Sequence, residues 1–103
     1  MYPSHEAFRL LNKWKNEKTT IRLLLTLSFG AASFVGRVAD VEGANIHFLS
    51  ADGSSEFLLS LIAASFEYQQ QRDEPESTAS DNYRRSLIAT FPSKAKIGFF
   101  LLP

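Results

Sequence analysis

Few residues of the 103-residue chain combine the type and the spacing that catalysis requires. Asp40 and Glu42 lie two positions apart in a segment of strand-forming residues, so both carboxylates would point to one side, as an acid–base pair must. Turn residues follow them directly, and such positions favour solvated carboxylates. We therefore interpret Asp40 and Glu42 as surface charges.

The two histidines offer no metal site. His5 lies in a terminal segment, and His47 alternates with apolar residues that would face a core, which turns its own side chain outward. The chain has no cysteine, and neither histidine has a second ligand at metal spacing. A triad of His47, Asp40 and a serine lacks the sequence of a nucleophile elbow. The sequence predicts no enzyme, no metal and no cofactor.

The charged residues are segregated, although the net charge is zero. Residues 1–40 hold six Lys and Arg against three Asp and Glu, residues 41–82 hold one against eight, and residues 83–103 hold four against none. Segregation permits a local basic face on a neutral protein, although a merely solvated face is an equally good interpretation. The candidate phosphate-binding residues of the first basic group are Lys13, Lys15, Lys18, Arg22 and Arg37. Those of the second are Arg84, Arg85, Lys94 and Lys96.

Size and composition indicate one domain with a modest core. The absence of cysteine is compatible with a reducing compartment. The longest apolar run, residues 21–29, contains Arg22 and is far shorter than the ~20 residues of a membrane-spanning helix. We expect a cytoplasmic protein with no membrane partner and no small-molecule substrate.

A helix is expected over residues 4–18, because Ala7, Phe8, Leu11 and Trp14 recur at helical spacing. Such an apolar stripe is typical of a helix that covers the end of a barrel.

Short strands separated by turn residues are expected over residues 19–68, as in a small antiparallel barrel. The expected turns are residues 30–33, 42–45 and 51–54, and a kink is expected near residues 61–63. In the first strand the odd-numbered residues should face the core. Gly36 should mark a bend or a close backbone approach. The predicted strands are residues 21–29, 34–41, 46–50, 56–61 and 64–68.

The remainder of the chain divides into two parts. Residues 69–82 have no apolar side chain larger than alanine and are expected to form a mobile loop. Residues 83–103 are expected to form a hairpin, with strands at residues 86–91 and 96–102. This apolar hairpin must extend the sheet, cover its face or form a subunit interface. In an alternative register, residues 69–82 are an insertion and residues 86–91 are the last barrel strand.

The order helix, apolar strand, turn and Phe34-Val35-Gly36-Arg37-Val38 is similar to the start of Sm-like proteins of the LSm and Hfq-like type. Residues 36–42 followed by residues 45–49 fit the same pattern, and the resemblance covers about residues 7–68. It implies a mainly β fold: a small SH3-like, Sm-like antiparallel β-barrel of five strands after an N-terminal α-helix. The C-terminal β-hairpin would be an addition to it.

The resemblance also implies a homo-oligomeric ring of about five to seven subunits, in which the fourth strand of one copy pairs with the fifth of the next. The implied interface residues are Phe57, Leu58, Leu59, Phe66 and Tyr68.

Sm-like rings bind uridine-rich RNA through a stacking residue and a polar residue near the turn between strands two and three. Asn45 lies close to the polar position, but Gly43 and Ala44 offer no stacking surface. The turn after the fourth strand has no basic residue either. The expected function is RNA association through Asn45 and the first basic group. The alternatives are a structural or protein-interaction module of the Sm fold without uridine binding, and a monomeric SH3-like peptide binder.

Overall fold

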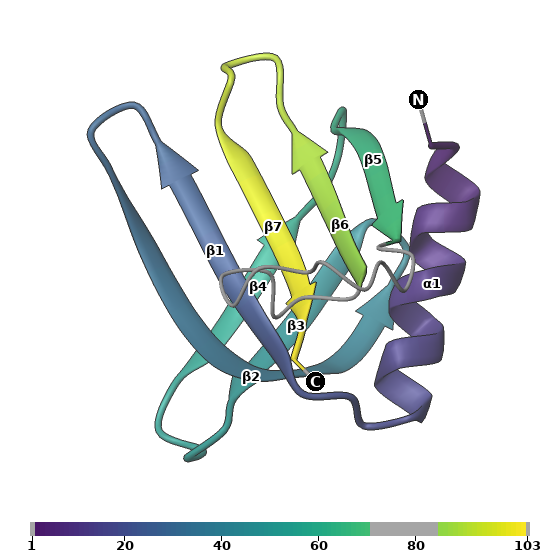
Figure 1. The fold of residues 1–103 in the computed structure, drawn as a ribbon, viewed down its shortest axis with the longest axis vertical. Helices are drawn as coiled ribbons and strands as arrows, with labels where there is room; N and C mark the ends of the chain where they lie inside the picture. The colour runs from purple at the N-terminus through teal and green to yellow at the C-terminus, as the bar shows by residue number, and fades with distance from the viewer. Residues whose placement is uncertain (1, 71–84, 103) are drawn as a thin grey trace, which may run out of the picture.

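One helix and seven strands form the fold of residues 2–70 and 85–102, the residues that the computed structural model describes (Figure 1). Neighbouring strands are antiparallel and form a single sheet with the order β4-β3-β2-β1-β7-β6-β5. A mainly β fold with an N-terminal helix is therefore confirmed. The elements are α1 (Ser4–Asn16), β1 (Ile21–Leu27), β2 (Gly30–Glu42), β3 (Asn45–Ser50), β4 (Glu56–Ser60), β5 (Ser65–Gln70), β6 (Arg85–Thr90) and β7 (Lys96–Leu101).

β2 is shared by two halves of the sheet. It is 13 residues long, and it pairs with β1 over residues 30–36 and with β3 over residues 36–42. Only Gly36 belongs to both ladders, because it lies opposite Ile21 on one side and Ser50 on the other. A Cβ atom at Gly36 would collide with the Leu49 carbonyl and lie 2.8 Å from Ser50 Cα. The predicted close backbone approach is confirmed.

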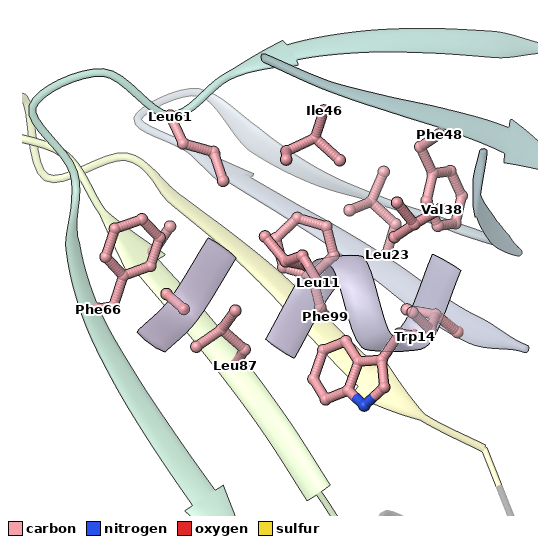
Figure 2. Packing of buried hydrophobic residues seen from close by; sticks show 13 residues of the cluster. Leu11, Trp14, Leu23, Val38, Ile46, Phe48, Leu61, Phe66, Leu87 and Phe99 are labelled. Atoms are coloured by element: carbon pink, nitrogen blue, oxygen red, sulfur yellow. The ribbon is translucent and has the colours of Figure 1, made fainter. Parts of the chain in front are cut away.

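α1 packs on β2 and β5 and supplies one side of the core. Ala7, Leu11 and Trp14 of its apolar stripe are buried, while Phe8 is half-buried with its ring edge-on to Phe66, at a centroid distance of 5.6 Å. Figure 2 shows the buried side chains gathered between the helix and the strands. The two halves of the sheet thus share one core.

α1 ends two residues before the predicted limit. The Thr19 N–H donates to the Trp14 carbonyl and the Lys18 N–H donates to the Lys15 carbonyl, both at 3.1 Å. Lys18 has a left-handed φ of 52°. These features form the Schellman motif that terminates many helices.

No helix in the described ranges is long and apolar enough to cross a bilayer.

The C-terminal hairpin lies inside the sheet. β7 pairs with β1, β6 pairs with β7, and β5 pairs with β6. Of the three predicted placements for this hairpin, extension of the sheet is therefore correct. The alternative register is correct in that residues 86–91 continue the sheet beside β5, but wrong in making them the last strand, because β7 follows and pairs with β1. Residues 69 and 70, predicted to begin the loop, belong to β5. The rest of that predicted loop lies outside the described residues.

The first hairpin is longer than predicted. Residues 30–33 were expected to form a turn, but they pair with residues 24–27, and the turn is Ser28-Phe29. Pairing with β1 satisfies their backbone groups, which overrides the weak strand preference of Gly, Ala and Ser. The hairpin extends beyond the core in consequence. Leu27 and Phe29, expected to face the core, are 44% and 86% exposed.

Asp52 organises the turn between β3 and β4. Its Oδ1 accepts from the Ser54 N–H at 3.0 Å and from the Ser54 and Ser50 hydroxyls, each at 2.7 Å. These bonds, with those from Ser54 contributing most, lower the pKa of Asp52 from 3.8 to about 2. The ionised form of Asp52 is therefore the form that stabilises this turn.

Gly36→Ala should destabilise the fold by at least about 2 kcal/mol, because the new methyl group would meet backbone atoms that cannot rotate away. The measurement is urea unfolding followed by circular dichroism. Gly98→Ala is the matched control, since the nearest atom to its Cβ is a Phe100 side-chain carbon at 2.5 Å, and an aromatic ring can move aside. An equal loss in the two variants would contradict the backbone argument.

Asp52 should make the stability of the fold depend on pH in the acidic range. A depressed folded-state pKa contributes stability that is present above the ordinary value of 3.8 and is lost as the pH falls through about 2. Thermal unfolding between about pH 5 and pH 2 should therefore fall less steeply for Asp52→Asn than for the wild type. Ser54→Ala removes the largest cause of the shift and should flatten the profile in part. Three superimposable profiles would exclude this role.

Candidate functional site

A hollow of about 360 Å³ lies on β2, β3 and β4. It is rich in carboxylates, and its lining residues are Asp40, Glu42, Asn45, His47, Glu56 and Leu58. We call it the acidic hollow. All six residues come from the turn-proximal half of β2 and from the β3–β4 hairpin, so a small number of register contacts fixes their positions.

A β-bulge turns Asp40 toward this surface. The register of β2 against β3 shifts between Val38, which is buried, and Asp40, which is exposed. Strict alternation would place residues 38 and 40 on the same face of the strand. The extra residue, Ala39, resets the alternation, so that Val41 packs against the core while Asp40 and Glu42 remain exposed.

Cross-strand pairing then assembles the rest of the acidic hollow. His47 lies opposite Asp40 on one side and opposite Leu58 on the other, and Asn45 lies opposite Glu42. The Nε2 atom of His47 is 3.5 Å from Oε2 of Glu56. The imidazole thus lies between carboxylates from both neighbouring strands.

Lys15 of α1 reaches the edge of the acidic hollow. Its Nζ lies 3.3 Å from Oδ1 of Asp40, which also accepts from the Val41 N–H at 2.9 Å. The Lys15 contact first, and the Val41 bond second, lower the pKa of Asp40 below its ordinary value. Asp40 is therefore held ionised, and a carboxyl group of this kind is a weak proton acceptor near neutral pH.

The chemistry available to this surface is attraction of positive charge. In the described ranges, no group of three His, Asp or Glu side chains is placed to hold a metal ion. The Asp40 and Glu42 pair does share a face, as the sequence predicts, but it is exposed to solvent. The arrangement suits a basic peptide segment or a dissolved cation better than an oxyanion.

The structure does not bring the six predicted RNA-binding residues together. Asn45 lies in the acidic hollow, where neighbouring carboxylates repel phosphate, and Lys15 is paired with Asp40. Arg37 lies at the other end of the β2–β3 ladder and lines a separate hollow of about 280 Å³. Arg22 Nη1 donates to Ser33 Oγ at 3.0 Å, which ties it to β2. Lys13 and Lys18 are exposed.

The predicted interface residues lie on the two outer strands of the sheet, β4 and β5. Phe57 and Leu59 pack against the core, and Phe66 is buried within it, so these side chains are not available to another subunit. Tyr68 is half-buried, with its ring centroid 5.2 Å from that of Tyr2. Leu58 alone of the five is fully outward, at 77% exposure.

Sequence reasoning missed two contacts of the acidic hollow, those of Glu56 with His47 and of Lys15 with Asp40. The first was accessible in principle, because a turn at residues 51–55 places Glu56 and Leu58 beside β3. The second joins distant segments and has no local signal. The bulge at Ala39 has no local signal in the sequence either.

Neither the family models nor the curated proteins and solved structures include a match to this chain.

Proposed function

We propose that this protein is an assembly module of the Sm type, whose copies join edge to edge through β4 and β5. The observation that carries the proposal is that β4 and β5 are the two ends of one strongly curved sheet. Each has a sheet partner on one side only within the described residues. Pairing β4 of one copy with β5 of the next would leave no edge open in a closed ring.

The backbone of β4 is suited to strand addition. The Ser50 N–H donates to the Ser55 carbonyl, and the Leu61 N–H donates to the Ala44 carbonyl. Hydrogen-bonded pairs alternate along an antiparallel ladder, so Phe57 and Leu59 bond to β3 while Leu58 directs its N–H and C=O away from it. This edge carries neither proline nor lysine, the residues that commonly block edge pairing.

β5 has one position of its edge occupied. The Tyr2 N–H donates to the Phe66 carbonyl at 2.9 Å, and the two residues form an isolated bridge. The backbone groups of Tyr68, two residues further along, point to the same side. The incoming β4 would therefore pair along the second half of β5, or would displace Tyr2.

The curved seven-stranded sheet with α1 packed on it agrees with an Sm-type barrel whose sheet has gained the β6–β7 hairpin. The proposed function does not include uridine binding. It corresponds to the structural alternative considered from the sequence.

Leu58→Pro should prevent assembly. It removes the edge N–H of β4 without removing a bond to β3, and proline is tolerated on edge strands. We expect a salt-stable oligomer of about five to seven subunits for the wild type and a folded monomer for the variant, measured by light scattering with circular dichroism. Leu58→Thr retains the donor and should still assemble.

A wild-type monomer at micromolar concentration would overturn the proposal. A dimer that Leu58→Pro dissociates would indicate β4–β4 pairing and would exclude the ring. Should Leu58→Pro unfold, Leu58→Lys blocks the same edge by charge and serves as the second variant.

RNA association is the second candidate, and Arg37 is the observation that favours it. The residues that line its hollow include Thr20 and Ser50 but no Asp or Glu. Lys13 and Lys18, at the end of α1, are free of the ion pair that holds Lys15. Exposed cations are suited to a phosphate backbone.

The triple variant Lys13→Ala, Lys18→Ala, Arg37→Ala should weaken binding of a mixed-sequence RNA by at least about tenfold at low salt, since each lost phosphate contact reduces affinity. Fluorescence anisotropy across a salt series measures this. Lys15→Ala is the control and should bind at least as well as the wild type, because Lys15 is paired with Asp40. An RNA affinity that does not change with salt concentration would exclude phosphate recognition.

A further inference from the structure

Three connections of the sheet lie at one end of the molecule. They are the β1–β2 turn, the β6–β7 loop and the β4–β5 turn, all at the top of Figure 1. The strand register supports the same arrangement. Five residues that lie opposite one another on five neighbouring strands form a row next to the β1–β2 turn, the β6–β7 loop and the start of β5. That row consists of Ala31, Thr26, Lys96, Thr90 and Ser65. We call this end the turn face.

Large apolar side chains are concentrated on the turn face. Phe29 and Leu27 of the β1–β2 turn are 86% and 44% exposed, and Ile62 of the β4–β5 turn is 68% exposed. They are three of the four large apolar side chains that are exposed in the described ranges. Single exposed apolar residues are normal on a protein surface, but several at one end indicate an interaction surface.

Two lysines lie between these apolar turns. Lys94 is in the β6–β7 loop, and Lys96 begins β7 opposite Thr26. The Lys94 N–H donates to the Phe91 carbonyl at 2.8 Å, and Lys94 has a left-handed φ of 71°. Glycine would adopt this conformation with less strain.

No carboxylate belongs to the hairpins that form most of the turn face. The sequence has no Asp or Glu in residues 18–39, 57–66 or 85–103. The acidic residues of the elements beside this end are Glu67 of β5 and Glu6 of α1, and Glu6 Oε1 lies 3.3 Å from Arg9 Nη1. No carboxylate on their own hairpin therefore neutralises the charges of Lys94 and Lys96.

We propose that the turn face docks on an anionic phospholipid surface. Phe29, Leu27 and Ile62 enter the boundary between headgroups and acyl chains, and Lys94 and Lys96 contact lipid phosphates. Apolar insertion and electrostatic attraction together produce reversible binding of this kind. The sequence-based expectation of no membrane partner depended on the lack of a spanning segment, and docking from one side requires none.

The side chains favour lipid over nucleic acid as the occupant. Phe29 could stack on a base, but the aliphatic side chains of Leu27 and Ile62 offer no π surface for stacking. Both aliphatic groups gain by transfer into hydrocarbon. The proposal is independent of edge-to-edge assembly, because it uses the turns at the ends of the strands rather than the backbone of β4 and β5.

The test is flotation of the full chain with vesicles of phosphatidylcholine containing phosphatidylglycerol, compared with vesicles of phosphatidylcholine alone. We expect binding to the anionic vesicles that weakens with salt. Phe29→Ser should reduce partitioning at least about tenfold, because it removes a large apolar side chain. Lys94→Gly combined with Lys96→Ser should reduce it by about 25-fold, at about fivefold for each charge.

Conservative variants separate docking from a loss of fold. Phe29→Trp should retain binding and show a blue-shifted emission on anionic vesicles, whereas the native Trp14 is buried and should not respond. Lys94→Gly also relieves backbone strain, so weaker binding of the lysine variant cannot come from unfolding at that position.

Three results would overturn the proposal. They are no binding to anionic vesicles, equal binding to both kinds of vesicle, and binding that Phe29→Ser leaves unchanged. The turn face would be assigned to nucleic acid instead if the wild type bound single-stranded RNA but not vesicles and Phe29→Ser no longer bound that RNA.

Discussion

The close contact between β2 and β3 at Gly36 is the constraint on which the rest of the structure depends. The β1–β2 and β2–β3 ladders overlap only at this residue. The two halves of the sheet therefore meet at Gly36, and the sheet bends there. Any side chain at this position would meet the backbone of residues 49 and 50. The approach allows residues from both halves, such as Leu23 and Ile46, to enter the same core beneath α1. A bend enforced by backbone contact is more rigid than one made by side chains, because backbone atoms have no rotamers to change.

The segregation of charge follows from the same topology. The bulge at Ala39, three residues after Gly36, turns Asp40 outward beside Glu42, and both line the acidic hollow with Glu56 of β4. The β6–β7 hairpin, which has no acidic residue, enters the sheet beside β1. Residues far apart in the sequence therefore form one carboxylate-free region at the centre of the sheet. The neutral net charge of the chain conceals an acidic hollow on β2, β3 and β4 and a centre of the sheet without carboxylates.

Much of the fold could be predicted from the sequence, because strong local patterns agree with it. The stripe of Ala7, Leu11 and Trp14 predicts α1, and alternation predicts each of the strands within a few residues. The prediction failed at residues 30–33, where Gly, Ala and Ser suggest a turn but the long β1 strand provides a partner. Composition reports what a segment prefers in isolation, whereas pairing depends on a neighbour.

The candidate site was less predictable than the fold. The acidic hollow depends on a bulge and on a contact between α1 and β2, and neither leaves a periodic signal. The turn face depends on strand order: Phe29 and Lys94 are distant in sequence and come to one end only because β7 inserts beside β1. From the sequence alone, the basic C-terminal group is only a cluster of positive charges. The strand register adds that two of its lysines lie beside exposed apolar turns.

Insertion of the hairpin also determines which surfaces remain open for contact. With β6 and β7 between them, β1 and β5 are separated, and β5 becomes the end of the sheet opposite β4. The two ends are not equivalent, since Tyr2 occupies part of the β5 edge and the β4 edge carries the exposed Leu58. Unequal edges favour a head-to-tail contact over a symmetric one, and a head-to-tail contact that closes produces a ring. The edges run along the strands and the turn face lies across their ends. Assembly would therefore leave the apolar turns of every copy exposed, and a ring that presents many such turns to one surface would bind it more tightly than a single copy.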